Sequence, residues 1–525
     1  MPRRSPDQEP VARPEVRPEA RRADANEAVD RLDFAVGGTL AALAALLYLG
    51  TAPAVVNLDG LGYIKLIPHN FAAGHLLYMP ILRLAAAIVR GDGLLAGRVA
   101  NAVAGGVAVG TAFGCARALL PRAPSVLAAA GLAVSYGVWV QGSDVEVYAW
   151  ALVALLGVLA LALAYRRAPS LLGALALGLA LSGAVLMHLT HVIITPFVAA
   201  WVLAFAPRRR RLAHAALSVG VGGAVSLAAY AWAALHVRHL DLAGAVRWIK
   251  TAGHGFPYGG GLIQRCGDAA HGLAKAFVWS PYLYESDAQT LLGQFLLGLV
   301  PLATVVGLVV ARRRALAHLP WAQFAVWAIP YAGMALLFFG SDHERWVFVL
   351  PPLWILAAAA THSLGRRGPL VGAALVAYLA VVNAHTAIGP ARHWSWDRTR
   401  ADAAAALMRD GDLVIFPGHS WDEYVGFYTH TKIEPLPIAY YLGRDGREAC
   451  LARIDKELRA ARARGGRVFA VRLFDDDDGD GRGFYELSQL GFPRPALRQL
   501  FSRYRPQALP TLQPKVTVWR LDDPN

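Results

Sequence analysis

The stretch Val56–Pro80, VNLDGLGYIKLIPHNFAAGHLLYMP, directly follows the first long apolar run of the chain. It carries four ionisable side chains, Asp59, Lys65, His69 and His75, beside segments long enough to cross a bilayer. A charged group at bilayer depth costs roughly 2.5–3.5 kcal/mol on insertion scales. A membrane segment that keeps several such groups is expected to use them, so this stretch is the first candidate for a functional site.

Composition indicates a membrane protein. Of 525 residues, 56% are hydrophobic and only 17% are charged, and the mean hydropathy is +0.38. Many apolar runs reach the roughly 20 residues that cross a hydrocarbon core of about 30 Å. Backbone groups within lipid must be satisfied internally, so a polytopic α-helical bundle is predicted.

The positive charge is concentrated in the membrane half. The net charge is +14, but the segment from Gly389 to the end holds 21 Lys/Arg and 19 Asp/Glu, which is 21 − 19 = +2. The excess therefore lies in short arginine clusters between apolar runs, as the positive-inside rule describes. This placement argues against nucleic acid as a partner and favours the cytoplasmic (inner) membrane.

The arginine clusters predict the topology. Residues 1–33 are rich in Arg, Pro, Glu and Ala and are expected to form a disordered cytoplasmic tail. The run Phe34–Pro53 is then an uncleaved first span. Placing every cluster inside gives eleven spans and an outer C-terminus. The clusters are Arg117/Arg122, Arg166/Arg167, Arg208–Arg211, Arg312–Arg314 and Arg366/Arg367, and the later spans are 97–119, 124–140, 147–164, 170–187, 191–206, 212–236, 289–310, 319–340, 346–362 and 369–388.

One apolar run has to stay on one side of the membrane. If His75–Val89 also crossed, every later cluster would face outside. This run is short, carries Arg83 and is followed by Arg90, so it is interpreted as an interfacial helix. The membrane domain is then 34–388, with outer loops 54–96 and 237–288.

The segment 389–525 has the composition of a small soluble domain on the outer face. Its alternation of helix and strand patterns predicts an α/β fold, and no G-x-G-x-x-G dinucleotide motif is present. We expect a module that covers the site or handles the acceptor. The predicted helices are 397–409, 420–430, 446–464 and 483–490, and the predicted strands are 412–417, 467–473 and 515–520.

Asp59 is the candidate catalytic residue at the outer mouth of the first span. Transfer of a group to a hydroxyl requires a base, and a partly desolvated carboxylate has a pKa raised towards the working range. Lys65, His69 and His75 are candidates to neutralise a departing phosphate. The alternative is that Asp59 is an ordinary loop carboxylate that caps the following turn.

A second outer turn, Gly142–Trp150 (GSDVEVYAW), carries Asp144, Glu146 and Tyr148. The two carboxylates are candidates to orient an acceptor or to help hold a divalent cation, although two ligands are too few for a metal site. The alternative is capping of the next helix by Ser143 or Asp144.

Two further outer turns carry candidate substrate contacts. His188 and His191 (HLTH) are placed to meet a phosphate, or they are satisfied core histidines. Arg345, in SDHERW, is the best candidate to hold a lipid phosphate, because its guanidinium fork matches phosphate oxygens. The alternative is an interfacial ion pair with Asp342 or Glu344.

The cysteines and the acidic run Asp475–Gly481 carry less information. Cys115 is expected in the core, and Cys266 and Cys450 are expected as unpaired thiols rather than as a disulfide. The acidic run begins like a calcium loop, but Leu487 stands where that loop has glutamate, so a solvated loop is preferred.

Taken together, these stretches resemble the GT-C superfamily of membrane glycosyltransferases, and more closely the bacterial branch related to protein O-mannosyltransferases. The likeness rests on Asp59 through Pro68 and His69, on VEVYAW (Val145–Trp150), on His188-Leu-Thr with Pro196 downstream, and on DLVIFPGHSWDEYVGFYTH in the soluble domain. Two departures stand out: no second acid follows Asp59 closely, and a His-Pro-Pro element is replaced by Pro68-His69-Asn70.

The resemblance implies an inverting glycosyltransferase. Its donor would be a sugar on a polyprenyl phosphate, its acceptor a hydroxyl of a protein, lipid or glycan on the outer face, and its base Asp59. Part of the superfamily uses a divalent cation, so a metal stays open. Two alternatives remain: a transporter or flippase of a lipid-linked intermediate, and a non-catalytic relative.

Overall fold

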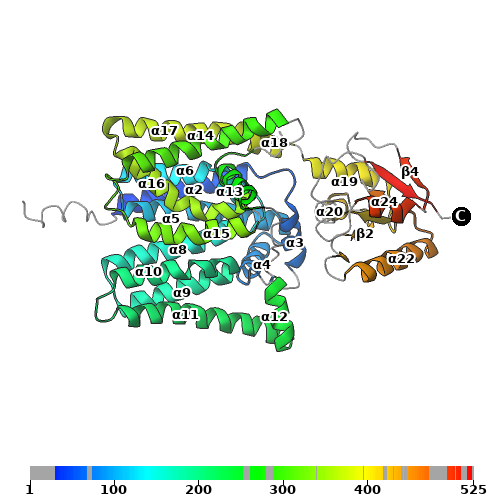
Figure 1. Cartoon of the computed structure of the whole chain (residues 1–525), viewed down its shortest axis with the longest axis horizontal. Helices are drawn as coiled ribbons and strands as arrows, with labels where there is room; N and C mark the ends of the chain where they lie inside the picture. Colours follow the sequence, from blue (N-terminus) through cyan, green and yellow to red (C-terminus); the bar gives the residue numbers. More distant parts are fainter. Residues whose placement is uncertain are drawn as a thin grey trace, which may run out of the picture.

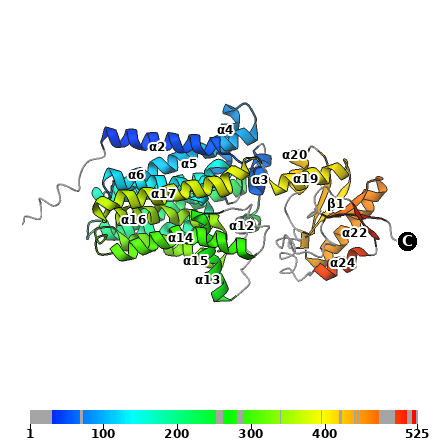
Figure 2. The same ribbon diagram turned by 90° about the horizontal axis from the view of Figure 1, so that it is seen from above.

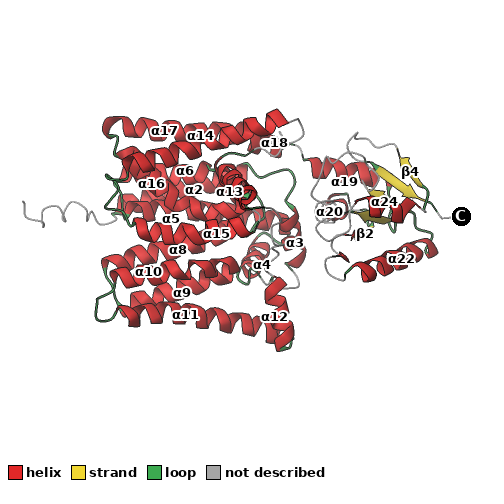
Figure 3. Cartoon of the chain, in the orientation of Figure 1, coloured by secondary structure: helices red, strands yellow, loops and turns green. Residues whose placement is uncertain are grey.

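The structure of the chain is a computed structural model in which a helical bundle is joined to a small α/β domain (Figure 1). The chain runs through the bundle first and ends in the α/β domain, and both parts are seen in Figure 3. The residues that it describes are 30–67, 72, 74–251, 261–279, 288–338, 340–393, 395–417, 422–429, 431–438, 441–442, 446–471, 494–502, 504–509 and 517–522.

The helices and short helical turns of the described part of the bundle are as follows. The α-helices are α2 (Arg31–Gly50), α3 (Leu58–Leu66), α4 (Tyr78–Ile88), α5 (Gly93–Arg117), α6 (Arg122–Val134), α7 (Tyr136–Ser143), α8 (Tyr148–Arg167), α9 (Leu171–Met187), α10 (Thr195–Phe205), α11 (Arg211–Trp232), α12 (Leu242–Thr251), α13 (Leu262–Phe277), α14 (Ala288–Arg312), α15 (Trp321–Leu337), α16 (Leu350–His362), α17 (Gly368–Asn383) and α18 (Gly389–Ala391). Short 3-10 or π turns are η1 (Leu189–Ile194), η2 (Ala233–Val237), η4 (His343–Val349), η5 (Gly365–Arg367) and η6 (Ala384–Ile388).

These helices make the chain a multi-pass membrane protein. Within the described residues, five helical segments are long and apolar enough to cross a membrane, and the bent pair α6–α7 would make a sixth. Five shorter apolar helices accompany them. The polytopic helical class predicted from composition is therefore confirmed, while the count of eleven spans stays a prediction. The connection 237–288, expected as a loop, contains the helices α12 and α13.

The bend between α6 and α7 is stabilised by side chains of other helices. The two helices meet at 63° around Ser135. The Trp354 indole donates to the Ser135 hydroxyl at 2.9 Å, and the Asn383 amide donates to the Val134 carbonyl at 2.8 Å. These bonds satisfy polar groups that the helix break releases in an apolar environment. The bend fixes the direction of α7, whose end leads into the turn with Asp144.

Helix α4 begins and ends at the same end of the bundle. The N–H of Leu77 donates to the Leu186 carbonyl at the end of α9. After α4 the chain comes back into contact with α3 at Gly93, where a Cβ atom would lie 3.1 Å from the Ile64 side chain. Eleven residues of helix span about 16 Å, half of a hydrocarbon core. This arrangement is the one predicted for a helix that does not cross.

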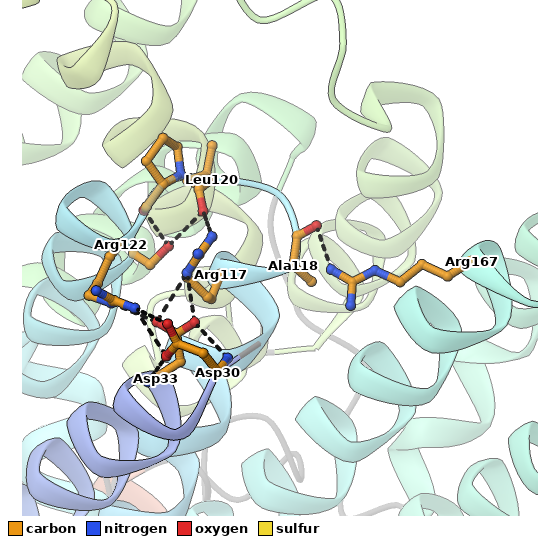
Figure 4. A network of polar contacts seen from close by, with 9 residues as sticks. Asp30, Asp33, Arg117, Ala118, Leu120, Arg122 and Arg167 are labelled. Carbon is orange, nitrogen blue, oxygen red and sulfur yellow. Dashed lines mark hydrogen bonds and ion pairs between the residues drawn. The ribbon is translucent and has the colours of Figure 1, made fainter. Parts of the chain in front are cut away.

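The described arginine clusters of the bundle lie at the end away from the soluble domain. In Figure 1 the connections α10–α11, α14–α15 and α16–α17 all lie at that end. There Arg117 and Arg122 both bind Asp33 at the start of α2, at 3.1 and 2.7 Å, and Arg122 also binds Asp30 (Figure 4). One end of the bundle is thus basic, as the positive-inside interpretation requires.

The soluble domain contains a five-stranded sheet in the order β2-β1-β3-β5-β4. Strands β2, β1 and β3 are parallel, and β5 is antiparallel to both β3 and β4. This arrangement confirms the predicted α/β class. The strands are β1 (Leu413–Phe416), β2 (Glu434–Pro437), β3 (Val468–Val471), β4 (Pro506–Leu509) and β5 (Val518–Leu521), and the helices are α19 (Trp396–Leu407), α20 (Asp422–Tyr428), α22 (Arg447–Ala463) and α24 (Arg494–Ser502).

Helix α3 lies between the bundle and the soluble domain (Figure 2). One apolar cluster joins Val56, Leu61 and Val145 of the membrane domain to side chains of α19, α20 and the sheet, including Phe416 and Tyr424. A second core lies within the soluble domain around α22 and α24. All three cysteines are free thiols, with Cys115 and Cys450 buried and Cys266 exposed, which confirms the prediction of unpaired thiols.

Candidate functional site

Asp59 lies in the first turn of α3, with its side chain exposed at the end of the bundle that faces the soluble domain. The helix starts there because Asn57 caps it: the Asn57 side chain accepts the N–H of Gly60 at 2.6 Å. A carboxylate in the first turn also interacts favourably with the helix dipole. The local sequence NLDG thus presents Asp59 at a fixed position.

Helix α3 is bound tightly to the turn between α7 and α8. The Asn57 N–H donates to Asp144 Oδ2 at 3.1 Å. Gly60 lies so close to this turn that a Cβ atom on it would be 2.5 Å from the Val145 carbonyl oxygen. The glycine after Asp59 therefore allows the two backbones to touch.

The turn between α7 and α8 is also stabilised by contacts with α5. Buried Asn101 uses its amide nitrogen to donate to the carbonyl of Asp144 at 2.8 Å and to the carbonyl of Glu146. Gly97, one turn earlier, leaves room for the Val145 side chain, which a Cβ atom would approach to 2.6 Å. The turn that carries the two carboxylates is consequently rigid.

Both carboxyl groups of this turn are buried, and their pKa values are raised. Burial raises the pKa of Asp144 to about 6, against hydrogen bonds from the Val145 and Asn57 N–H groups that lower it. Burial also raises the pKa of Glu146 well above its usual value, and the nearby charges of Glu344, Asp59 and Asp144 raise it further. Both shifts favour the protonated carboxyl group, and Asp59 is the exposed acid beside them.

The segment η4 is the third element of the site, after α3 and the turn between α7 and α8. Gln141 of α7 donates to Glu344 Oε1 at 3.3 Å, and Arg345 donates to the Tyr148 hydroxyl at 3.4 Å. The charge of Asp59 acts on both Glu344 and Arg345. Asp59 and Arg345, which are 286 positions apart in the sequence, therefore lie within electrostatic range of each other.

Histidines and tyrosines form one wall beside these groups. The His188 ring lies 4.7 Å from the His75 ring and 5.3 Å from the Tyr148 ring, centroid to centroid. His188 is fixed by a 2.6 Å hydrogen bond between its Nδ1 and the Thr190 hydroxyl. Three of the predicted binding residues, His75, Tyr148 and His188, are therefore in ring contact.

The remaining predicted residues lie differently. His191 is fully buried, and its two nitrogens contact the Tyr331 hydroxyl at 2.7 Å and the Ala151 carbonyl at 3.2 Å, as in a core histidine. Lys65 forms an exposed 2.7 Å ion pair with Glu423 of α20. His69 lies outside the described residues.

Three residues of the site were not selected from the sequence: Asn57, Asn101 and Glu344. The sequence does indicate a role for Asn101, because an amide in an otherwise apolar span usually has a specific hydrogen-bond partner. The sequence indicates Glu344 only as an ion-pair partner for Arg345. Asn57 resembled an ordinary loop residue, and its double role follows from the fold.

The donor set does not form a ready metal site. Within the described part of the chain, no group of three His, Cys, Asp or Glu side chains is placed to hold a metal ion. The Asp144 carboxylate already accepts two backbone N–H groups, from Asn57 and Val145. The site as it stands offers an exposed carboxylate, two buried carboxyl groups, a guanidinium and an aromatic wall.

Comparison with known proteins identifies the fold. No family model matches the sequence, and no curated protein matches it. Two crystal structures of ArnT from Cupriavidus metallidurans, one bound to undecaprenyl phosphate and one in the apo state, match with TM-scores of 0.58 and 0.54 at 14% and 13% identity. Each comparison covers 92% of this chain and 97% of that one.

An oligosaccharyltransferase from Archaeoglobus fulgidus, in a crystal structure with Zn and sulfate, has a TM-score of 0.53 at 13% identity. That match covers 88% of this chain and 70% of the other. Both relatives are GT-C superfamily glycosyltransferases. At these identities the likeness establishes the fold, so the GT-C fold expected from the sequence is confirmed.

Proposed function

We propose that the chain is a membrane glycosyltransferase that moves a sugar from a polyprenyl-phosphate donor to an acceptor hydroxyl. The observation that carries the proposal is that one turn links the elements of Asp59 and Arg345: the Asn57 N–H at the start of α3 donates to Asp144, and Arg345 donates to the Tyr148 hydroxyl. A fold shared with ArnT, which was crystallised with undecaprenyl phosphate, supports a lipid-linked donor.

In this reaction Asp59 is the base. The acceptor oxygen attacks the anomeric carbon while Asp59 takes the hydroxyl proton, and the bond from the anomeric carbon to the phosphate oxygen breaks. One displacement of this kind inverts the configuration. Arg345 holds the phosphate and offsets the negative charge that it gains as it leaves.

The buried groups support this division of roles. The raised pKa of Glu146 favours its neutral form, which does not repel an anionic donor as a carboxylate would. His75, His188 and Tyr148 present ring faces and edges, which suit the apolar side of a sugar ring. Asp144 acts on α3 rather than on substrate, because it binds the Asn57 N–H.

The site is proposed to face the outer side of the cytoplasmic membrane. The described arginine clusters lie at the opposite end of the bundle, which the positive-inside rule assigns to the cytoplasm. The N-terminus would then be cytoplasmic, and the soluble domain extracytoplasmic. A flippase is the second candidate, but its charged groups are expected near the membrane midplane, and here they gather at one end.

The test uses the full-length protein in proteoliposomes with radiolabelled polyprenyl-phosphate sugars and a membrane extract as acceptor source. We expect label in the acceptor fraction with the wild type, and about 100- to 10,000-fold less with Asp59→Asn, which is the contribution of general-base catalysis. Asp402→Asn, an exposed acid on α19 paired with Arg398, is the matched control and should retain full transfer.

Either of two results would contradict the proposal. Full transfer by Asp59→Asn would remove Asp59 from the chemistry. Labelled donor that changes leaflet without cleavage, equally in both proteins, would favour the flippase. Mass spectrometry of membrane lipids from cells with and without the protein is an independent check, because loss of a transferase leaves its polyprenyl-phosphate sugar to accumulate.

A further inference from the structure

The start of α3 is held by side chains from different parts of the chain. The Val56 N–H donates to the Tyr428 hydroxyl of the soluble domain at 2.9 Å. The next N–H, that of Asn57, donates to Asp144 of the membrane domain at 3.1 Å, and the Gly60 N–H donates to the Asn57 side chain at 2.6 Å. Asp59 lies within this short segment, so its position depends on both domains.

The Tyr428 side chain is itself firmly placed. Its ring stacks on Tyr424 at 6.1 Å with an interplanar angle of 17°, and it meets the Phe427 ring edge-on at 4.9 Å. The Arg398 guanidinium lies 5.0 Å from the centre of the same ring. A ring with neighbours on several sides holds its hydroxyl at one point in space.

The bond to Val56 has no easy replacement. Val56 is fully buried in the cluster that joins the two domains. A buried N–H that loses its acceptor is left with an unfavourable desolvation, so the local backbone is expected to move. A second polar contact between α3 and α20, the ion pair Lys65–Glu423, is exposed and lies at the far end of the helix.

We infer that Tyr428 is a positioning residue for Asp59, and that the soluble domain thereby completes the catalytic site instead of only covering it. The inference rests on the proposed function, in which Asp59 is the base. Tyr428 acts through the Val56 N–H and the first turn of α3. Because displacement of a reacting group by about 1 Å can cost on the order of a hundredfold in rate, one such contact is enough to matter.

The test is Tyr428→Phe in the full-length protein, measured in two ways. In the transfer assay we expect kcat to fall about tenfold while KM for the donor changes less than about twofold, since the variant misplaces the base and leaves Arg345 intact. In hydrogen–deuterium exchange we expect faster exchange of the amides of residues 56–61, with the rest of the bundle unchanged.

Two controls separate positioning from general loosening of the domain. Glu423→Gln removes the exposed contact of α20 with α3, and Tyr504→Phe removes a tyrosine hydroxyl that contacts Asp455 within the soluble domain. Both should keep wild-type kcat and exchange. Equal losses in the controls, or unchanged kcat and exchange in Tyr428→Phe, would overturn the inference.

The two readouts also separate this inference from the proposed function. A wild type without transfer in any assay would end the glycosyltransferase proposal. The exchange of residues 56–61 would still decide whether Tyr428 holds α3: faster exchange supports the contact, and unchanged exchange overturns it.

Discussion

Gly60 and Val145 are in direct backbone contact: a Cβ atom at position 60 would stand 2.5 Å from the Val145 carbonyl oxygen. The residue after the proposed base therefore touches the turn that carries Asp144 and Glu146. Neither backbone can move aside easily, because Asn101 holds the turn and Asn57 holds the helix.

Gly60→Ala is expected to push α3 away from the turn and to lower transfer by about tenfold to a hundredfold. Gly62 lies on the same helix with open space around it, so Gly62→Ala adds the same methyl group without a clash. Transfer rates of the two variants, compared with the wild type, are the measurement. Equal activity of both alanine variants would show that the close contact is not needed.

Asn101 is expected to be important for stability. Asn101→Leu keeps the size of the side chain but leaves the carbonyls of Asp144 and Glu146 without their donor. Loss of a buried hydrogen-bond partner costs about 1–3 kcal/mol, so thermal unfolding in detergent should shift to lower temperature. Thr111→Ala on the exposed face of α5 is the control, since its hydroxyl binds only the Val107 carbonyl of its own helix. A shift no larger than that of the control would contradict this role.

Glu344 is expected to make the protein sensitive to alkaline pH. Burial, followed by the charge of Asp342, raises its pKa from 4.5 to about 8. The unfolded chain ionises this carboxyl above about pH 4.5, so its contribution to folding stability falls between pH 4.5 and 8, by up to about 1.4 kcal/mol per pH unit, and then levels off. Transfer should decline above pH 8, because an ionised Glu344 competes with the donor phosphate for Arg345.

Glu344→Gln removes the charge and keeps the shape of this side chain. Its transfer rate should stay flat from pH 7 to about 9, where the wild type declines, and its thermal unfolding should vary less between pH 5 and 8. Glu423→Gln, which changes an exposed glutamate, should retain the wild-type decline. An identical alkaline decline in Glu344→Gln would assign the effect to another group.

Asp33 is expected to stabilise the arginine-rich end of the bundle. It is fully buried and is shared by Arg117 and Arg122 (Figure 4). Asp33→Ala removes the carboxylate that buried Arg117 binds at 3.1 Å, and breaking such a pair costs about 3–5 kcal/mol. Asp30→Asn removes the exposed charge beside Arg122, keeps a side-chain oxygen that can cap α2, and should cost about 1 kcal/mol or less. The unfolding temperatures of the two variants measure this difference. Similar temperatures would show that Asp33 contributes no more to stability than Asp30 does.

The elements that the sequence predicted best are those with strong periodicity. Strands β1 and β3 fall within the predicted strands 412–417 and 467–473, and β5 overlaps the predicted strand 515–520 and ends one residue later. Strand β2 was missed because its sequence, EPLP, has two prolines and the look of a turn, which an edge strand tolerates. Strand β4, PQAL, is an edge strand at the other side of the sheet and escaped for the same reason.

The site was predictable in outline and not in detail. Placing every arginine cluster on one side of the membrane predicts that the turns carrying Asp59, Asp144, His188 and Arg345 all lie on the opposite side. In the structure these turns lie together. Sequence could not separate His188, which faces the site, from His191, which fills the core. Both lie on one outer turn, and only packing against Tyr331 decides between them.

The apolar cluster around α3 limits which substitutions and domain exchanges this protein can tolerate. Val56 and Leu61 face the soluble domain as much as they face Val145 of the bundle. A chimera with a different C-terminal domain would expose these side chains to water and leave the Val56 N–H without the Tyr428 hydroxyl as its acceptor. The membrane half and the soluble half are therefore expected to evolve together, and a substitution on α20 should require a matching change on α3.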